Sequence, residues 1–190
     1  MYKSDIRKTI RAQRKQLSAH IIADASHIVS EKILHHPAFL NAKKIALYIS
    51  HDNEIDLSEI MSRARELNKS IYLPILSDNN ELTFYEINSN TRFIKNKFGI
   101  DEPVVSNQSP VSPTELDLML IPLVAFDAQC NRLGRGAGYY DRTLQFTKNI
   151  SRDERPVLIG VAYEFQKVDQ LIPEAWDVKM DCIVTEFSFV

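Results

Sequence analysis

Three of the five glycines in the chain lie in one short segment, residues 131–142, with the sequence NRLGRGAGYYDR. Gly134, Gly136 and Gly138 alternate with other residues. Because glycine has no Cβ atom, the backbone N–H groups of such a segment can converge on one anion. The spacing matches neither a P-loop nor the dinucleotide-binding fingerprint. We interpret the segment as a cradle for phosphate, with a tight strand-to-helix turn as the alternative.

Charged side chains beside these glycines favour phosphate over a plain turn. Arg132 and Arg135 carry forked donors and a permanent positive charge, a combination that suits phosphate oxygens. Asp141 follows the last glycine by about one helical turn. Its carboxylate is the kind of hard oxygen ligand that Mg2+ prefers. We therefore predict that the segment binds phosphate groups and that Asp141 holds a divalent cation beside them.

Basic residues also follow one side of the first predicted helix, which covers residues 3–18. Its apolar residues Ile6, Ile10 and Leu17 fall on a narrow arc. A second arc of four basic residues lies beside this one: Lys3, Arg7, Arg11 and Arg14. Since the two arcs are neighbours, the basic arc can face the rim of a cleft. The alternative is a solvated basic face, which is commoner for any run of charges.

The elements that must position these residues alternate between helix and strand. Periodicity and turn residues predict helices over residues 3–18, 20–35, 57–67 and 139–147, the third with a capping-box-like start at Asp56 and Glu59. Apolar runs predict strands over residues 43–50, 71–76, 82–87, 117–127, 156–163 and 182–186. Pro74 indicates that its strand is short or lies at an edge. Residues 88–114 are polar and contain several prolines, so we expect mainly loop there.

This alternation predicts one α/β domain over residues 1–190. We expect a mostly parallel central sheet, flanked by helices in an open, Rossmann-like three-layer arrangement. Residues 117–127 form the strongest predicted strand and lead directly into the glycine segment. Ligands bind such sheets at the carboxyl edge of the strands, so we expect the glycine segment at that edge.

The composition is that of an ordinary globular protein, with 44% apolar and 25% charged residues. The formal net charge of -2 gives no general attraction to nucleic acid or anionic lipid, so an anion site must come from local clustering. Two separate cysteines, a charged N-terminus and the lack of a run of ~18 apolar residues indicate the cytoplasm. We expect a monomer that binds neither nucleic acid nor membrane.

The glycine segment, after a strand that ends in AFD, resembles the signature of 5-formyltetrahydrofolate cyclo-ligases, also called methenyltetrahydrofolate synthetases. Further segments occur in the family's order at about its spacing: KSDIRKTIRAQRK, LYISHDNEID, FGIDEP and IPEAWDVKMDCIVTE. The resemblance therefore covers nearly the whole chain. It implies the ATP- and Mg2+-dependent closure of 5-formyltetrahydrofolate, which can be polyglutamylated, to 5,10-methenyltetrahydrofolate, with release of ADP and phosphate.

The resemblance also implies the course of the reaction. The formyl oxygen takes the γ-phosphoryl group of ATP, N10 of the folate attacks the activated carbon, and phosphate leaves. Phosphorylation helps because an amide-like formyl group is a poor electrophile. Phosphoryl transfer asks a protein mainly to position reactants and neutralise charge, which arginines, glycine amides and a metal ion can do.

Carried over position by position, the family's pattern implies the site residues. The implied ATP-binding residues are Lys3, Arg7, Arg132, Leu133, Gly134, Arg135, Gly136, Ala137, Gly138, Tyr139 and Tyr140. The implied folate-binding residues are Ile49, Glu54, Arg135, Gly136, Ala137, Gly138 and Tyr139. The implied metal ligands are Asp141 and Asp177, with Asp181 as a nearby substitute. Arg135 and Tyr139 are the implied catalytic residues.

Several of these residues have plainer alternatives. Glu54 suits the donor-rich edge of a pterin, because a carboxylate accepts two donors at once, but exposed loop acids are common. Tyr139 or Tyr140 could instead be a core contact of the following helix. Many relatives carry a basic residue where this chain has Ala137, so we expect only the backbone of residue 137 to contact phosphate.

Two other functions fit parts of the sequence. One is a different enzyme of the same architecture that uses ATP or a sugar phosphate, because a fold does not fix a function. The other is an RNA-binding module that uses the basic arc of the first helix. The net charge and the lack of an aromatic and basic platform argue against the second function.

Overall fold

Six strands form the central sheet of the computed structural model, which describes residues 2–105 and 108–190. They are β1 (Lys44–Ala46), β2 (Ser70–Leu76), β3 (Leu82–Ile87), β6 (Leu118–Pro122), β9 (Val157–Val161) and β10 (Cys182–Val184). Their order across the sheet is β10-β9-β6-β1-β2-β3. Every neighbouring pair is parallel except β2 and β3, which are antiparallel. The prediction of a mostly parallel sheet is confirmed.

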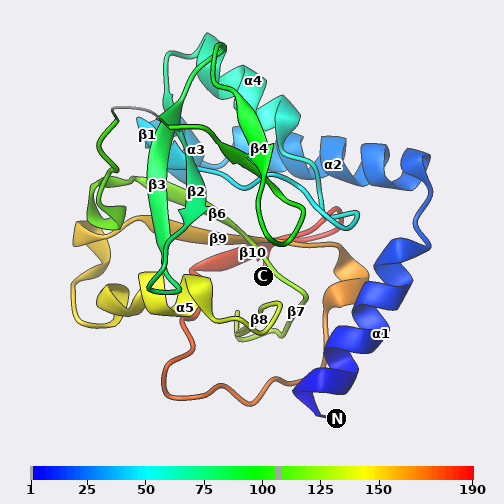
Figure 1. Ribbon diagram of the computed structural model, residues 1–190. Coiled ribbons are helices and arrows are strands. Elements are labelled where there is room, and N and C mark those ends of the chain that lie inside the picture. Colours follow the sequence, from blue (N-terminus) through cyan, green and yellow to red (C-terminus); the bar gives the residue numbers. More distant parts are fainter. Residues whose placement is uncertain (1, 106–107) are drawn as a thin grey trace.

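Helices cover both faces of this sheet. α2 (Ala19–Leu34), α3 (Pro37–Asn41) and α4 (Ser58–Glu66) lie on one face, and α5 (Tyr139–Thr143) with the 3-10 turn Gln145–Lys148 lies on the other (Figure 1). Ile33 and Ile60 are fully buried in the first apolar layer, and Leu144 in the second. Burying each such side chain contributes about 1.5–3 kcal/mol. These two apolar layers hold the predicted α/β arrangement together.

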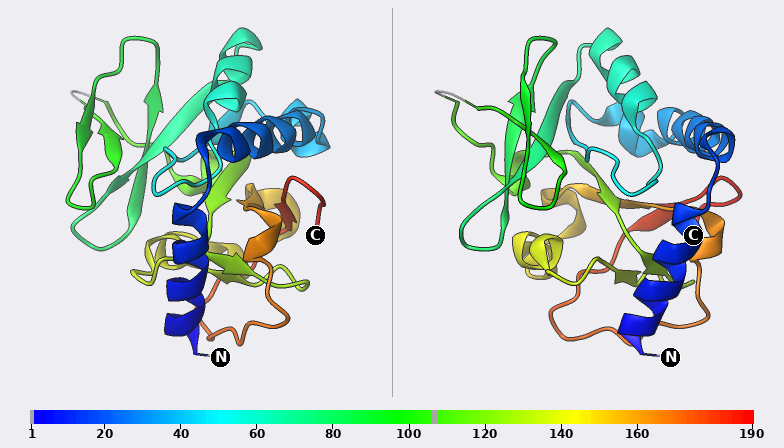
Figure 2. Two further views of the ribbon diagram at one scale, coloured as in Figure 1. Left: turned by 90° about the vertical axis from the view of Figure 1, so that its right-hand side faces the viewer. Right: turned by 45° about the vertical axis from the view of Figure 1, so that its right-hand side comes forward.

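Helix α1 (Lys3–Lys15) lies apart from the helices that cover the sheet (Figure 1). Both views of Figure 2 show it beside the ribbon that β7 (Ala125–Phe126) forms with β8 (Arg132–Leu133). Ile6 and Ile10 of α1 are buried in an apolar cluster with residues of this ribbon. The basic arc lies next to these isoleucines on α1. The packing of the isoleucines on the ribbon therefore directs the basic side chains toward the glycine segment, which follows β8.

The predicted strand over residues 117–127 is two strands in the structure, which is a correction. β6 ends at Pro122, and the chain leaves the sheet before β7 pairs with β8. The buried side chain of Gln166 donates to the carbonyl groups of Leu123 and Val124, at 2.8 Å each. It satisfies two backbone acceptors at the point where the chain bends. The glycine segment therefore starts from the short ribbon and not directly from a core strand.

Asp127 fixes the turn of this ribbon. Its buried carboxylate accepts from the backbone N–H groups of Gln129 and Asn131 at 3.0 Å and of Leu171 at 2.9 Å. Burial alone would raise the pKa of Asp127, but these bonds and one from the Asn131 side chain outweigh burial and lower the pKa. One carboxylate thus joins the ribbon to the segment that begins at Leu171 and carries Asp177.

Residues 88–114, predicted to be mainly loop, contain a second ribbon, so that prediction is wrong in part. β4 (Phe93–Lys95) and β5 (Asp101–Pro103) pair in antiparallel fashion. Glu102 accepts from the backbone N–H of Leu76 at 3.0 Å and from the side chain of Asn96 at 2.9 Å. These bonds tie the ribbon to the end of β2. All three residues of β4 are exposed, so no apolar alternation marks the strand in the sequence.

Other boundaries differ from the predictions by a few residues. β1 covers only three residues in the first half of the predicted strand 43–50, and α5 stops at Thr143 before the 3-10 turn continues the predicted helix. At the start of α4, Asp56 accepts from the Ser58 N–H, but Glu59 contacts His27 and forms no capping box. The prediction that the strand with Pro74 is short or at an edge is wrong, because β2 has seven residues and lies between β1 and β3. Pro74 is tolerated there because the ladder between β1 and β2 ends at Tyr72.

The sheet has a switch point between β1 and β6. These strands are neighbours, but β1 is followed by β2 on one side and β6 by β9 on the other. Such a change of direction opens a crevice at the carboxyl ends of the two strands. The loop after β1 carries Ile49 and Glu54, and the chain after β6 carries the glycine segment. The topology therefore brings two distant parts of the sequence to one edge.

Candidate active site

A cavity of about 1120 Å³ opens at this edge. Its walls come from α1, the loop after β1, the β2–β3 hairpin, the β4–β5 ribbon, the glycine segment and the segment around Asp177. Every residue predicted to bind ATP, folate or metal lines it. Asp181, the substitute metal ligand, instead forms an ion pair with Arg155 at 2.8 Å and is not among the lining residues. The structure brings the predicted residues together, while their individual roles stay predictions.

The glycine segment takes backbone conformations that favour glycine at two of its three positions. Gly136 has φ 112° and Gly138 has φ 70°, and Gly138 is the residue before the first turn of α5. A Cβ atom on Gly138 would lie 2.9 Å from a nitrogen of Arg142. Arg7 of α1 donates to the carbonyl of Gly134 at 2.8 Å and lies against Gly136. The loop is thus fixed between two arginines.

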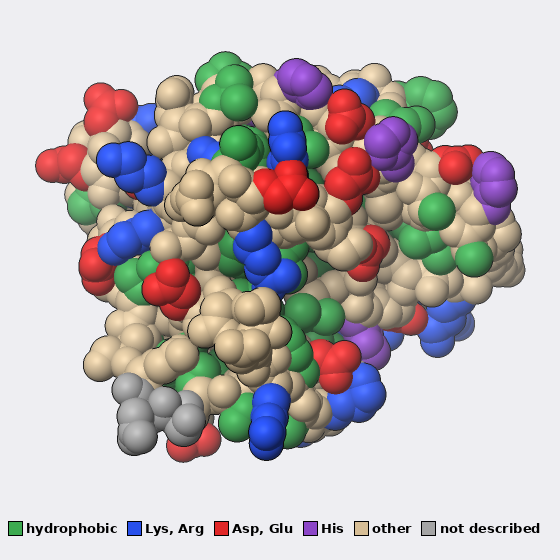
Figure 3. All heavy atoms as spheres, turned by 90° about the horizontal axis from the view of Figure 1, so that it is seen from above, with side chains coloured by type: hydrophobic (Ala, Val, Ile, Leu, Met, Phe, Trp, Pro, Cys, Tyr) green, Lys and Arg blue, Asp and Glu red, His purple; other side chains and the backbone are tan. Residues whose placement is uncertain are grey.

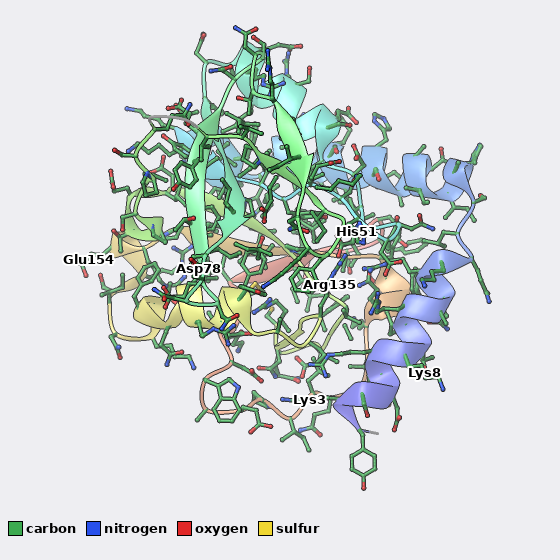
Figure 4. All side chains as sticks on the ribbon, viewed as in Figure 1. Lys3, Lys8, His51, Asp78, Arg135 and Glu154 are labelled. Atoms are coloured by element: carbon green, nitrogen blue, oxygen red, sulfur yellow. The ribbon has the colours of Figure 1, made fainter. Side chains whose placement is uncertain are left out.

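Arg135 forms an ion pair with Glu54, at 2.8 Å between Nη2 and Oε1. The same nitrogen donates to the carbonyl of His51 at 3.1 Å, and Figure 4 shows Arg135 and His51 close together. Glu54 is only 7% exposed, whereas the Arg135 side chain is 31% exposed. The sequence prediction assigned Glu54 to folate and Arg135 to both phosphate and folate. In the structure, the predicted phosphate-binding cation and the predicted folate-binding acid neutralise each other.

Arg132 and Asp141 form a second ion pair in the cavity wall. The guanidinium of Arg132 lies 5.6 Å from the centre of the Tyr140 ring, and its side chain is 3% exposed. Burial raises the pKa of Tyr140, so its phenol stays neutral. Within the described residues, the Nε atom of Arg132 is buried and lacks a hydrogen-bond partner. A buried N–H without a partner is unusual, because such groups are normally paired, and Arg132 also lines the cavity.

Lys3 joins the start of α1 to the segment around Asp177. Its ammonium nitrogen lies 3.2 Å from Asp177 and 3.4 Å from Glu174. In Figure 4, Lys3 points toward the interior of the molecule, and Lys8 points away on the other side of α1. The predicted metal ligand Asp177 therefore has a cationic partner, as Asp141 has in Arg132.

The basic arc of α1 faces the protein itself. Arg11 and Arg14 contact Asp52 at 3.1 and 3.4 Å, and Arg7 contacts the glycine segment. The face seen from above carries interspersed charges of both signs (Figure 3). The solvated-face alternative is therefore wrong for this arc apart from Arg11, and the RNA-binding alternative loses the basic surface on which it rests.

The residues present fit a nucleoside triphosphate. Four cations of the predicted set line the cavity beside an open glycine loop, and one of them, Arg132, has an unpaired buried donor. A metal ion would have fewer than three protein ligands here. The residues that the structure describes contain no group of three or more His, Cys, Asp or Glu side chains that could hold one. Asp141 and Asp177 suit Mg2+ that is also held by phosphate oxygens and water, as is usual for this ion.

Sequence reasoning missed several residues of the site. Arg14 was left without a role, although it continues the basic arc, and it contacts the acids of the loop after β1. Phe98 and Glu102 line the cavity through the unpredicted β4–β5 ribbon, and Trp176 lines it beside Asp177. The family-like segments FGIDEP and IPEAWDVKMDCIVTE contain or adjoin these residues, which was the available signal.

Comparisons with known proteins agree with this geometry. The model of the 5-formyltetrahydrofolate cyclo-ligase family matches residues 1–186. The chain belongs to this family. The Haemophilus influenzae 5-formyltetrahydrofolate cyclo-ligase is 37% identical over 180 residues, which cover 92% of this chain and 94% of the relative.

Solved structures of the family share the fold. The 5,10-methenyltetrahydrofolate synthetase of Aquifex aeolicus is 35% identical with a TM-score of 0.83, and the match covers 100% of this chain and 92% of that one. The Mycoplasma pneumoniae synthetase is 27% identical with a TM-score of 0.77, over 98% and 99% of the two chains. The predicted family and the enzyme class, a ligase, are confirmed. In the described part of the chain, no helix has the length and apolar character needed to cross a membrane.

Proposed function

We propose that the enzyme converts 5-formyltetrahydrofolate to 5,10-methenyltetrahydrofolate with ATP and Mg2+, and releases ADP and phosphate. The observation that carries this proposal is the shared cavity, which the glycine segment and the loop with Glu54 both line. Its volume of about 1120 Å³ is slightly above the ~300–1,000 Å³ of typical small-molecule pockets. That size supports simultaneous binding of two ligands.

Phosphate groups bind at the glycine segment in this proposal. Lys3, Arg7 and Arg132 line the cavity there and supply positive charge. Gly138 has no side chain to cap the first turn of α5, so backbone N–H groups of this turn can donate to phosphate. The unpaired Nε of Arg132 supplies a further donor. Bound phosphate would also compete with the carboxylates of the site for Lys3 and Arg132.

The folate binds at the loop after β1, where Glu54 accepts from the N–H groups along one edge of the pterin. Ile49 lies in the same wall and offers an apolar contact. A carboxylate repels phosphate, so the two ligands sort by charge within one cavity. Arg135 lies where the two parts of the cavity meet, since it contacts Glu54 from within the glycine segment.

In the reaction, ATP supplies the phosphoryl group that turns the formyl oxygen into a leaving group. Arg135 leaves Glu54 and neutralises the oxygens of the transferred group. Tyr139, at the first turn of α5, flanks the reacting atoms. N10 of the folate then forms a bond to the formyl carbon and loses its proton, and the C–O bond breaks to release phosphate. The chain's part is to hold reactants in line and to offset charge.

Mg2+ would be held by Asp141 and Asp177 together with phosphate oxygens. Both carboxylates line the cavity, but each accepts from a cation, Arg132 and Lys3 respectively. We expect these pairs to loosen as phosphates take over the two cations. When bound there, Mg2+ would supply positive charge that offsets the negative charge of the phosphate groups.

The direct test is incubation of the protein with 5-formyltetrahydrofolate, ATP and Mg2+, with the near-ultraviolet absorbance of the methenyl product as the signal. We expect product only when all three are present, together with one ADP per product. Omission of ATP or chelation of Mg2+ should each abolish the signal. Product formation without ATP, or none in the complete mixture, would contradict the proposal.

A further inference from the structure

We infer that Arg14 is a positioning residue for folate binding: it is the fixed counter-ion of Glu54, and so frees Arg135 to leave Glu54 for phosphate. This inference rests on the proposed function and concerns the same site. Arg14 does not line the cavity, so it would act through Glu54 and not by touching either ligand.

The first observation is the burial of Arg14. Its side chain is 0% exposed, although it belongs to the last turn of α1. Its Nη2 atom contacts Asp52 at 3.4 Å, while its Nε and Nη1 atoms are buried and lack a hydrogen-bond partner among the described residues. A buried guanidinium with unpaired donors is costly, and such a group calls for an explanation.

The second observation is that both arginines face the same atom of Glu54. Arg135 donates to Oε1 of Glu54 at 2.8 Å, and Nη1 of Arg14 lies 3.6 Å from that oxygen. The longer distance suits an ion pair but not a hydrogen bond. Arg14 therefore has a free donor directed at the oxygen that Arg135 occupies, and a small movement would let it take over.

The two arginines differ in freedom. The Arg135 side chain is 31% exposed and belongs to the glycine loop, whereas Arg14 is enclosed in the packed interior. Arg135 can turn toward a phosphoryl group, and Arg14 cannot follow it. If Arg135 left and no other cation remained, Glu54 would be a buried carboxylate without a counter-charge, which is energetically costly.

Other groups near Glu54 do not replace Arg14. Asp52 and Asp56 on the same loop are acids, as is Glu186 beyond Tyr163. Burial raises the pKa of Tyr48, Tyr140 and Tyr163, so these neighbours stay neutral. His51 offers its backbone N–H to Oε2 of Glu54 at 3.1 Å, Arg11 contacts Asp52 and not Glu54, and Arg132 pairs with Asp141. Arg14 is thus the buried positive charge at this carboxylate.

The test compares the binding of 5-formyltetrahydrofolate and of ATP, each measured by calorimetry, in wild type and variants. Arg14→Met removes the charge and keeps much of the side-chain length, and Arg14→Lys keeps the charge. Arg11→Met is the matched control, because it removes a cation from the same arc and from the same partner, Asp52. We expect Arg14→Met to weaken folate binding about tenfold and ATP binding less than twofold. Arg14→Lys should recover most of the loss, and Arg11→Met should stay near wild type.

A double-mutant cycle separates positioning from general damage. In the Glu54→Gln background, adding Arg14→Met should cost no further folate affinity, since its effect runs through the carboxylate. An equal additional loss in that background, or an equal loss of both ligands, would overturn the inference. So would an Arg14→Met variant with wild-type folate affinity.

Arg135→Ala tests the same point in case Arg14→Met does not fold, because it leaves the interior intact. With Arg14 still beside Glu54, Glu54→Gln should weaken folate binding in the Arg135→Ala background by about as much as it does in wild type. A Glu54→Gln substitution that costs no folate affinity in that background would show that Arg14 does not serve Glu54 once Arg135 is gone, and would overturn the inference. Wild-type protein that binds no 5-formyltetrahydrofolate would overturn the proposed function, and this inference with it.

Discussion

Arg135 is paired with Glu54 in the structure, whereas the proposed reaction requires the Arg135 side chain to contact phosphate. Its guanidinium accounts for one contact to the carboxylate and one to the His51 carbonyl, and both are at the surface of the cavity. Two other cations of the site are paired with acids in the same way, Arg132 with Asp141 and Lys3 with Asp177, while Arg7 contacts a backbone carbonyl. At the scale of single residues, most cations of the site therefore already have an acidic partner, and anionic ligands must compete with these pairs.

Arg135→Ala should lower ATP-dependent turnover and leave the fold intact. A charge-assisted contact to phosphate contributes about 1.5–3 kcal/mol, which corresponds to roughly a ten- to hundredfold loss of kcat/KM. Because the side chain is partly exposed and its partner Glu54 keeps Arg14 nearby, we expect a melting temperature close to that of wild type. Steady-state kinetics and thermal melting check this. Wild-type kinetics in a folded variant would remove Arg135 from the reaction.

Single residues of the site were predictable where a short motif contains them. The glycines, Arg132, Arg135 and Asp141 lie within one segment of unusual composition, and all line the cavity. Arg14 was not predictable, because its position on the arc does not reveal that its side chain is fully buried. The contacts of Arg14 are to residues 52–54 in the loop after β1, which is far from α1 in the sequence.

At the scale of elements, the strands buried on both faces were predictable and the ribbons were not. β6 and β9 are continuous apolar runs because neighbours and helices cover them. β4 has no buried residue, and β7 and β8 have two residues each, so neither pair leaves a period in the sequence. The bend after Pro122 could not be predicted from the sequence, because the apolar residues continue without a break from β6 into β7. Side-chain bonds such as those of Gln166 and Asp127 decide these turns.

Gly138→Ala should damage the start of α5 more than Gly134→Ala does. Gly138 has φ 70°, and a new Cβ atom would lie 2.9 Å from Arg142, which also donates to the carbonyls of Ala137 and Asn80. At Gly134, φ is ordinary and the nearest atom would be 3.4 Å away. We expect a free energy of unfolding about 1–2 kcal/mol lower for Gly138→Ala and a smaller change for the control. Chemical denaturation of both variants measures the difference, and equal losses would contradict the role of the backbone conformation.

The loop after β1 should lose stability in acid. Burial alone would raise the pKa of Asp52, but hydrogen bonds and charges from Arg11 and Arg14 outweigh it and hold the pKa below the ordinary 3.8. A lowered folded-state pKa means that the stabilisation is fully present above the unfolded value and is lost as pH falls through the folded value. Asp52→Asn should therefore flatten the fall in unfolding free energy below about pH 4. Denaturation midpoints from pH 7 to pH 2.5 test this, and parallel curves for variant and wild type would contradict it.

At the scale of the whole molecule, the switch point of the sheet creates the site. β1 and β6 end side by side, and each passes its chain to one wall of the same cavity. The parallel strand order was predictable from the alternation of helix and strand, and it implies a ligand site at this edge. The β4–β5 ribbon and the segment around Asp177 complete the walls, and their placement came only with the structure.

The central claim is that one cavity holds folate and nucleotide, sorted by charge, and the binding of both ligands to Glu54→Gln tests it most directly. Loss of the charge that the pterin donors require should weaken 5-formyltetrahydrofolate binding by about 1.5–3 kcal/mol, or roughly ten- to a hundredfold. ATP affinity should be unchanged or slightly higher, because the substitution releases Arg135 from its ion pair. Calorimetry of each ligand with the folded variant gives both constants. Normal folate affinity, or a loss of ATP binding in its place, would contradict the account.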